Sequence, residues 1–176
     1  PVISAYLRVT LLSGARREEI ACLQWEDVDF RWLTMTIRDK VEGERVIPLT
    51  PYVAHLLSGL PRRNQWVFSS MSAADGRLVE PRIAHNKALA VAGLPSLSIH
   101  GLRRSFGTLA EWVEMPTGVV AQIQGHKPSA IAEKHYRRRP VDLLRMWHTK
   151  LEAWILECAD IEFIPVEVTE RLRVVK

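Results

Sequence analysis

Four short segments of the sequence hold side chains whose types and spacing could do chemistry. They contain Arg16 with Glu19, Lys40, His100 with Arg103, and His126 with Tyr136. Arginine stays charged at any working pH and can donate paired hydrogen bonds to the oxygens of an anion. Histidine and lysine can transfer protons, and a tyrosine becomes a nucleophile when a proton acceptor is close. Taken singly, each has an ordinary explanation: a lone histidine is more often structural, and an arginine three residues before a glutamate is usually a surface pair.

The order of these segments resembles the catalytic domain of the tyrosine recombinases, the phage integrase family. In that family the first arginine lies in a T-G-x-R-x-x-E segment, matched here by residues 13–19, and a hairpin lysine precedes a V-P-L strand end, matched by Lys40 and residues 46–49. The H-x-L-R and L-G-H segments are matched by residues 100–103 and 124–126, followed by Tyr136. The matching elements extend from about residue 11 to residue 139, and the run after His126 is most similar to integrases of prophages and genomic islands.

Three supporting positions depart from the family's pattern. The chain has serine instead of threonine at Ser13, glycine instead of aspartate at Gly101, and glutamine instead of leucine at Gln124. The spacing from His126 to Tyr136 is also slightly longer than in some members. None of these departures removes a catalytic side chain.

The resemblance implies site-specific DNA recombination (integration or excision) by strand cleavage and rejoining, without a metal or other cofactor. Cleavage of a phosphodiester builds negative charge on the phosphoryl oxygens, which many nucleases balance with a metal ion. No carboxylate cluster at metal-ligand spacing is visible in the sequence, so the guanidinium groups of Arg16 and Arg103 are expected to balance it. Glu19, one helical turn beyond Arg16, is a supporting residue that could orient it or form an ordinary solvent-exposed pair.

The resemblance also assigns the steps that move protons and bonds. Tyr136 is the expected nucleophile and would form a 3′-phosphotyrosyl intermediate. Its reference pKa near 10 requires help from a proton acceptor. His100 is expected to assist proton transfer, His126 to hydrogen-bond the scissile phosphate, and Lys40 to protonate the departing 5′-oxygen.

The net charge of +4 is concentrated in one part of the chain. Residues 1–80 are neutral, residues 81–140 carry nine basic and three acidic side chains, and residues 141–176 carry five basic and seven acidic ones. A basic segment indicates an anionic partner, most commonly nucleic acid, although a solvated basic helical face explains the charge equally well. With the resemblance, the expected contacts to double-stranded DNA are Arg104, Lys127, Arg137, Arg138 and Arg139.

Hydrophobic periodicity predicts a mainly α (α+β) fold with a small antiparallel sheet near the N-terminal third. Alternation over residues 33–38 and 45–49 predicts a hairpin, and residues 66–69 and 163–168 are candidate short strands. Residues 25–30 are expected to form a turn and residues 71–78 a polar loop. The helical segments are expected at residues 2–12, 16–23, 51–57, 81–92, 98–113, 117–124, around 130–136, and at 141–159.

The 176 residues suffice for one domain, expected here as a single catalytic domain with a core at about 2–158 and a tail at 159–176. The chain opens at Pro1, and with the resemblance we expect the N-terminal core-binding and arm-binding domains of the family to be absent from it. No apolar run approaches the roughly 18 residues of a membrane span. Cys22 and Cys158 are expected to be reduced thiols of a cytoplasmic, nucleoid-associated bacterial protein.

An apolar stripe at helical spacing follows the expected nucleophile; its members are Leu143, Leu144, Trp147, Leu151, Trp154 and Ile155. It could pack on its own core or dock onto a neighbouring subunit. The expected assembly is a homotetramer on DNA and a monomer when free. Tyr6 and Tyr52 lie in apolar helical patterns and are expected to be structural.

Two alternatives to recombination follow from the same residues. A type IB topoisomerase-like enzyme would use the same chemistry but reseal the same strand. A catalytically silent module on the same fold would bind DNA without forming a covalent adduct. A zinc site is not expected, because the remaining histidines have no partner at metal-ligand spacing; they are His55, His85, His135 and His148.

Overall fold

The structure, a computed structural model, describes residues 1–39, 43–126 and 138–165 of the chain. The predicted mainly helical fold with a small antiparallel sheet is confirmed, and the segment expected to be helical around residues 130–136 lies outside the described residues. The elements, in chain order, are α1 (Val2–Ser13), α2 (Arg17–Ala21), the 3-10 turn η1 (Trp25–Asp27), β1 (Val28–Asp29), β2 (Thr34–Asp39), β3 (Gly43–Pro48), α3 (Pro51–Ser58), α4 (Arg82–Val91), α5 (Ile99–Trp112), α6 (Thr117–Gln124) and α8 (Val141–Cys158).

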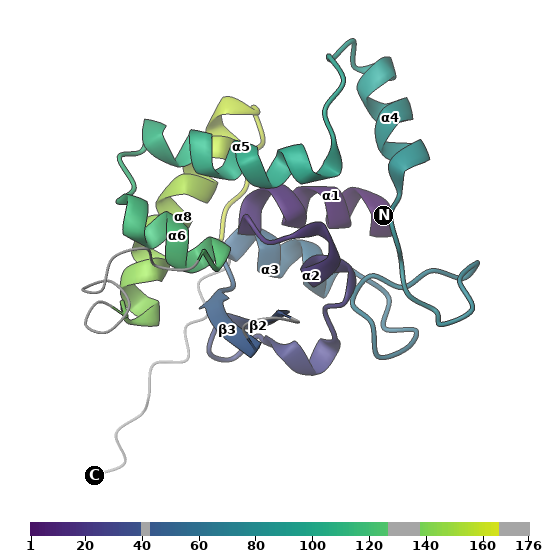
Figure 1. The fold of residues 1–176 in the computed structure, drawn as a ribbon, viewed down its shortest axis with the longest axis horizontal. Helices are drawn as coiled ribbons and strands as arrows, with labels where there is room; N and C mark the ends of the chain where they lie inside the picture. The colour runs from purple at the N-terminus through teal and green to yellow at the C-terminus, as the bar shows by residue number, and fades with distance from the viewer. Residues whose placement is uncertain (40–42, 127–137, 166–176) are drawn as a thin grey trace.

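The centre of the molecule is a pair of helices, α1 and α5, which lie one above the other in Figure 1. Their apolar residues recur at helical spacing, so each helix presents one stripe to the core. Strands β2 and β3 lie below this pair, α6 and α8 lie to one side, and α4 projects from the opposite corner (Figure 1). The buried side chains of the central pair include Tyr6, Val9 and Leu12 from α1 and Leu102, Phe106 and Ala110 from α5.

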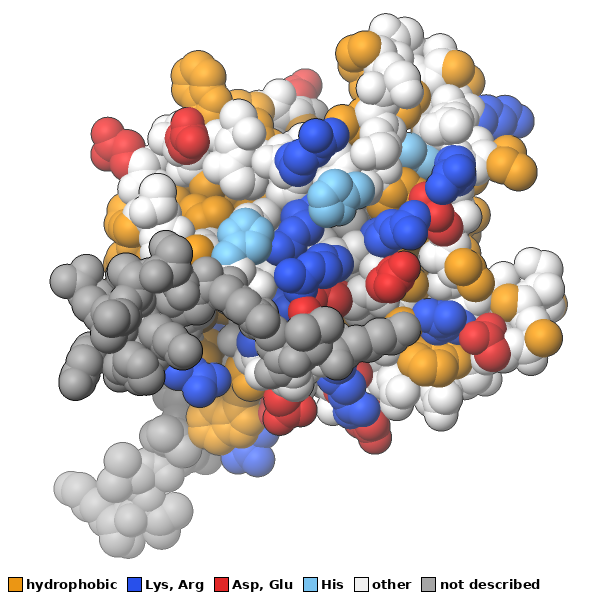
Figure 2. All heavy atoms as spheres, in the orientation of Figure 1, with side chains coloured by type: hydrophobic (Ala, Val, Ile, Leu, Met, Phe, Trp, Pro, Cys, Tyr) orange, Lys and Arg blue, Asp and Glu red, His pale blue; other side chains and the backbone are white. Residues whose placement is uncertain are grey.

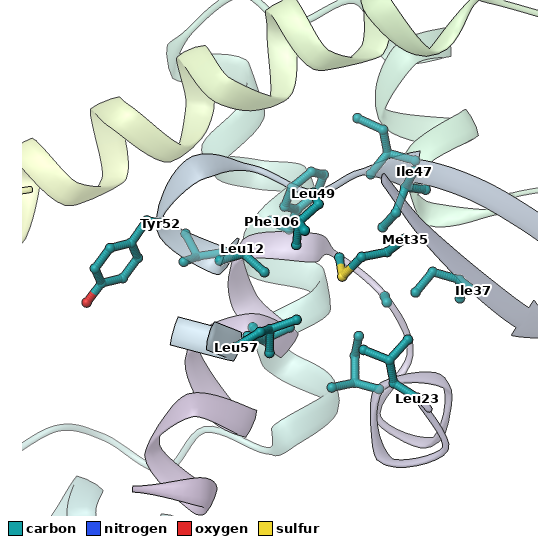
Figure 3. Packing of buried hydrophobic residues seen from close by; sticks show 14 of the residues in the cluster. Leu12, Leu23, Met35, Ile37, Ile47, Leu49, Tyr52, Leu57 and Phe106 are labelled. Carbon is teal, nitrogen blue, oxygen red and sulfur yellow. The ribbon is translucent and has the colours of Figure 1, made fainter. Parts of the chain in front are cut away.

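The sheet forms as the alternating pattern predicts. Strands β2 and β3 pair antiparallel, with Met35 opposite Ile47 and Ile37 opposite Arg45. Because side chains alternate between faces, Met35, Ile37 and Ile47 share the buried face, where they join the core shown in Figure 3. The segment expected to be a turn also supplies a third strand, since Val28 of β1 pairs with Met35.

Two expected short strands are wrong for the residues that the structure describes. Residues 66–69 form only isolated bridges, Gln24 with Trp66 and Ser69 with Arg77, and the amide of Trp66 bonds to the Asn64 side chain at 3.0 Å, as in a loop. Residues 163–165 form no strand; the ring of Phe163 packs edge-on against Tyr52 instead, with ring centroids 5.1 Å apart. The rest of that candidate strand lies outside the described residues.

Helix α8 packs on its own core. Leu144 and Leu151 are fully buried, while Trp147, Trp154 and Ile155 are half-buried against the same cluster and Leu143 is exposed. The carboxylate of Glu152 accepts hydrogen bonds from the Thr50 hydroxyl and from the amides of Tyr52 at 2.8 Å and Val53 at 3.2 Å. This carboxylate therefore caps the N-terminus of α3 and ties α8 to the end of the hairpin. Burial raises the pKa of Glu152 despite these hydrogen bonds.

The two tyrosines expected to be structural are buried, which confirms that expectation. The Tyr6 hydroxyl donates to the carbonyl of Arg17 at 2.9 Å, and burial raises the pKa of Tyr6 to about 12. The Tyr52 hydroxyl accepts from Arg8 at 2.9 Å. None of the helices among the described residues is long and apolar enough to cross a membrane.

A buried histidine joins α8 to the last turn of α1. Nε2 of His148 lies 2.7 Å from the carbonyl oxygen of Leu12, and because a carbonyl can only accept, Nε2 carries the proton. The other ring nitrogen, Nδ1, is buried without a hydrogen-bond partner, and the ring packs edge-on against Phe106. Burial lowers the pKa of His148 to about 4, so this histidine is neutral at physiological pH.

This buried histidine makes the fold sensitive to acid. The unfolded chain protonates His148 near pH 6.5, whereas the folded chain resists protonation until about pH 4. The resulting stability is fully present above pH 6.5 and is lost as the pH falls through this window, by about 3 kcal/mol in total. Urea unfolding of the wild-type protein across the window should show this loss. The His148→Gln variant, which cannot titrate there, should lose correspondingly less; parallel pH curves for the two proteins would contradict the prediction.

Candidate active site

The first catalytic candidate, Arg16, is held by a glutamate one turn further along. Arg16 is the N-cap residue of α2, and its backbone amide donates to Oε2 of Glu19 at 2.7 Å. Its guanidinium Nη1 donates to Oε1 of the same carboxylate at 2.8 Å and also to the carboxylate of Asp39 at the end of β2. Glu19 is buried, whereas 40% of the Arg16 side chain is exposed, so the pair is buried on the glutamate side and open to solvent on the arginine side.

Glu19 bridges two arginines. Arg45 of β3 donates from Nη1 to Oε1 at 2.9 Å and from Nη2 to Oε2 at 2.7 Å. Burial alone would raise the pKa of Glu19, but the hydrogen bonds and charge of Arg45, together with the bonds from Arg16, outweigh it and the pKa is lowered. The carboxylate is therefore charged at neutral pH and balances cations on both sides.

Arg103 lies on the buried face of α5 and reaches the same cluster. Its Nη1 donates to the carbonyl of Gly14 at 2.7 Å, and Ser98 caps α5 by accepting from the amide of Gly101 at 3.0 Å. Burial, and then the charge of Arg16, lowers the pKa of Arg103 to about 10, so the guanidinium remains charged at neutral pH. Although 87 residues separate Arg16 from Arg103 in the sequence, the fold brings their charges close enough to repel.

The two histidine candidates lie beside these arginines. His126 follows α6, and its amide bonds to the carbonyl of Ala121 at 2.8 Å. Burial lowers the pKa of His126, and the charges of Arg103, Arg16 and Arg45 lower it further, so the imidazole is neutral at pH 7. His100 is exposed on α5, about one turn before Arg103. Figure 2 shows Lys, Arg and His side chains gathered in a band across the middle of this face.

Several predicted residues cannot be placed in the site. Lys40, Lys127, Tyr136 and Arg137 lie outside the described residues. Of the other expected DNA contacts, Arg104 and Arg138 are exposed and Arg139 is half-buried. Among the described residues, no group of three or more His, Cys, Asp or Glu side chains is arranged to hold a metal ion.

The chain re-enters the described structure beside α6. The amide of Arg139 donates to Oε1 of Gln122 at 3.0 Å, and the carbonyl of Arg139 accepts from Nε2 of Gln122 at 2.9 Å. His126 and Arg139 are therefore both hydrogen-bonded to residues of α6.

The residues at the three departures from the family's pattern each make a defined contact in the structure. Ser13 accepts from the amide of Ala15 at 3.3 Å, so its hydroxyl supports the turn before Arg16. Gln124 donates from Nε2 to the carbonyl of Arg103 at 2.8 Å and thereby joins α6 to α5. At Gly101 a Cβ would lie only 2.5 Å from the Leu97 side chain, which favours glycine.

Two further charged residues, Arg45 and Asp39, belong to the cluster and were not predicted from the sequence. The alternation of inward and outward side chains along the hairpin could have indicated that both residues face inward. Asp39 shares a face of β2 with Met35 and Ile37, and Arg45 shares a face of β3 with Ile47. Charged side chains on the buried face of a strand need partners there. The structure supplies Arg16 as the partner of Asp39 and Glu19 as the partner of Arg45.

Comparison with known proteins identifies the family of this chain. Residues 2–141 match the phage integrase family. The chain belongs to that family. It is 65% identical over 168 residues to the prophage integrase IntF of Escherichia coli (strain K12), a match that covers 92% of this chain and 36% of that protein.

Solved structures of integrases have the same fold. The integrase from mycobacterium phage Brujita superposes with a TM-score of 0.68 at 25% identity, covering 85% of this chain and 51% of that one. A lambda integrase tetramer bound to a Holliday junction gives a TM-score of 0.57 at 13% identity, covering 80% of this chain and 44% of that one. The chain thus spans about a third to a half of the length of these relatives.

Gly14, whose carbonyl accepts a hydrogen bond from Arg103, lies in a position that favours glycine. Gly14 ends α1 with φ +61, and a Cβ there would lie 2.6 Å from the ring of Phe106. Gly14→Ala should therefore lower the free energy of unfolding by about 3 kcal/mol, from backbone strain and overpacking together.

Gly93→Ala is the matched control for this substitution. Gly93 has φ +64, but a Cβ there would meet nothing within 4 Å, so only the backbone cost of about 1 kcal/mol should remain. Urea unfolding of both variants measures the difference, and equal losses would show that the contact with Phe106 is unimportant.

Proposed function

We propose that this chain is the catalytic domain of a site-specific tyrosine recombinase, an integrase that cuts and rejoins duplex DNA. The observation that carries the proposal is the convergence of Arg16, Arg103 and His126 from three separate elements. Such an arrangement suits a phosphodiester, because guanidinium groups bind its non-bridging oxygens bidentately. The chain covers only part of its relatives, so the activity of the whole protein is part of the proposal.

The arginines supply the main electrostatic stabilisation. Negative charge grows on the phosphoryl oxygens as the nucleophile attacks, and cations already fixed in place require no reorganisation at that moment. Glu19 and Asp39 hold the Arg16 guanidinium, while the carbonyl of Gly14 holds that of Arg103. In this mechanism the guanidinium groups balance the negative charge that many nucleases balance with a metal ion.

Tyr136 is the proposed nucleophile. Its phenol oxygen attacks phosphorus, the bond from phosphorus to the 5′-oxygen breaks, and the chain becomes joined to the 3′-phosphate. His100 helps remove the phenol proton, and Lys40 protonates the departing 5′-oxygen. His126, neutral at pH 7, donates a hydrogen bond to the phosphate. The attachment of Arg139, three residues after Tyr136 in the sequence, to Gln122 of α6 supports this assignment, because His126 follows the same helix.

Strand exchange follows from the covalent intermediate. The phosphotyrosyl bond conserves the energy of the broken phosphodiester, so a 5′-hydroxyl of another strand can attack it and release Tyr136 without net hydrolysis. We propose double-stranded DNA as the partner, a homotetramer as the assembly on DNA, and the bacterial cytoplasm at the nucleoid as the location. The lambda relative, a tetramer on a Holliday junction, supports the assembly. The proposed DNA contacts are Arg104, Lys127, Arg137, Arg138 and Arg139.

Replacement of the nucleophile tests the proposal directly. On a nicked suicide duplex, the wild-type protein should form a covalent protein–DNA conjugate whose mass maps to the peptide containing Tyr136. Tyr136→Phe should abolish the conjugate and leave DNA binding near the wild-type level. Tyr52→Phe, which changes a buried tyrosine, is the matched control and should still form it. A conjugate in Tyr136→Phe would identify another nucleophile, and DNA binding without any wild-type conjugate would favour the silent module. Relaxation of supercoiled DNA without partner sites would favour the topoisomerase-like activity.

A modified substrate tests Lys40 as the general acid. Lys40→Ala should slow cleavage about 10²-fold or more, because the 5′-oxygen is a poor leaving group without a proton. A 5′-bridging phosphorothiolate, whose sulfur leaves without protonation, should restore the rate of this variant but not that of Tyr136→Phe. Failure to restore it would remove Lys40 from this role.

A further inference from the structure

Arg45 is a charged residue on the buried face of the hairpin. Its register partner is Ile37 of β2, and it shares a face of β3 with Ile47, both fully buried. Only 14% of the Arg45 side chain is exposed. The hairpin thus directs a guanidinium inward, toward α2 and α6.

Three hydrogen bonds fix that guanidinium, and each goes to a different acceptor atom. Nη1 and Nη2 bind the two oxygens of Glu19 at 2.9 and 2.7 Å, which is the fork geometry that arginine makes with a carboxylate. Nε donates to the carbonyl of Ile123 at 3.0 Å. That carbonyl belongs to the last turn of α6, where helix carbonyls lack partners within the helix and a cation is favoured.

The two ends of this bridge lead to different catalytic candidates. Glu19 binds both the backbone amide and the guanidinium of Arg16. Ile123 lies three residues before His126, with Gly125 between them in the left-handed conformation at φ +69. Arg45 is therefore a direct connection between Glu19, which binds Arg16, and the end of α6, which His126 follows.

The Arg45 guanidinium packs directly against the turn at Gly125. A Cβ at Gly125 would lie 2.7 Å from Nη1, 2.8 Å from Cζ and 2.9 Å from Nε of Arg45. A side chain at this position would have to displace Arg45 as well as adopt a strained backbone. The absence of a side chain at Gly125 therefore leaves room for the Arg45 guanidinium to make its hydrogen bonds.

We propose that Arg45 is a positioning residue that fixes Arg16 and His126 relative to each other around the scissile phosphate, acting through Glu19 and the end of α6. This inference rests on the proposed function. In this role Arg45 acts through Glu19 and Ile123, to which its fork and its Nε are hydrogen-bonded. Misplacement of catalytic groups by about 1 Å can slow a reaction about 10²-fold, which sets the expected effect.

The experiment compares Arg45→Met and Arg45→Lys with Arg38→Met in the 176-residue chain. Arg38 is the matched control because it lies on the same hairpin and is also ion-paired, but on the outer face, with Glu26 and Asp27. The measurements are the single-turnover rate of covalent conjugate formation at saturating DNA, the affinity for DNA, and the pKa of the His126 imidazole by NMR.

Arg45→Met should slow conjugate formation about 10²-fold at nearly unchanged DNA affinity, while Arg38→Met should react at the wild-type rate. The pKa of His126 should rise, because one of the cations that lower it is gone. Arg45→Lys restores the charge but cannot make all three bonds. It should therefore return the pKa of His126 toward its wild-type value without restoring the rate. Full rescue by lysine, or a wild-type rate in Arg45→Met, would overturn the inference.

A double-mutant cycle tests whether Arg45 acts through Glu19. If it does, Arg45→Met combined with Glu19→Gln should react no more slowly than the slower single variant, because both remove the same link. If the rate losses of the two single variants multiply in the double variant, Arg45 does not act through Glu19. Melting curves identify any variant that is unfolded; if Arg45→Met is, then Arg45→Lys and Gly125→Ala carry the test, and a wild-type rate in either would be contrary to the inference.

The proposed function and this inference fail in different ways. If the wild-type protein forms no conjugate, the proposed function fails. NMR titration can still test the connection between Arg45 and His126, because an unchanged pKa of His126 in Arg45→Met would overturn it. If the wild-type protein reacts and Arg45→Met reacts equally fast, only the role of Arg45 is lost.

Discussion

The candidate site depends on one buried carboxylate, that of Glu19. Three guanidinium groups, those of Arg16, Arg45 and Arg103, are close enough to repel one another, since, in addition to burial, the charges of Arg16 and Arg45 both lower the pKa of Arg103. Glu19 binds two of them directly, and Asp39 adds a second negative charge. These five groups together retain one unbalanced positive charge, which is the sign that attracts a phosphodiester. The site is thus stable without substrate and still electrostatically suited to it.

Much of the frame could be predicted from the sequence, because it follows from local rules. The helices and the hairpin are set by the spacing of apolar residues, and α1 ends at Gly14 with a positive φ as a helix–glycine boundary predicts. Arg16 and Glu19 lie three residues apart across the first turn of α2, so their contact was also within reach of the sequence. For the catalytic roles, and for Lys40 and Tyr136 above all, the sequence supports a prediction that the described residues do not test.

The parts that were missed depend on long-range contacts to the backbone. The bond from Arg45 to the carbonyl of Ile123 joins residues 78 apart, and that from Arg103 to the carbonyl of Gly14 joins residues 89 apart. Every residue has a carbonyl, so the acceptor leaves no trace in the sequence. The false strand at residues 66–69 has the opposite cause: its side chains are typical of a strand, but a single asparagine, Asn64, engages the backbone as a loop does.

The contact between His148 and the carbonyl of Leu12 has a consequence for biosynthesis. It joins residues 136 apart, so the end of the first helix cannot acquire this partner until α8 has been translated. Topologies closed by such distant pairings fold slowly. While the ribosome still holds the C-terminal part, the apolar stripe of α1 and the ring of Phe106 lack their final cover. A nascent chain is therefore exposed to aggregation late in synthesis, and it acquires the geometry of the candidate site only once nearly all of the described residues have emerged.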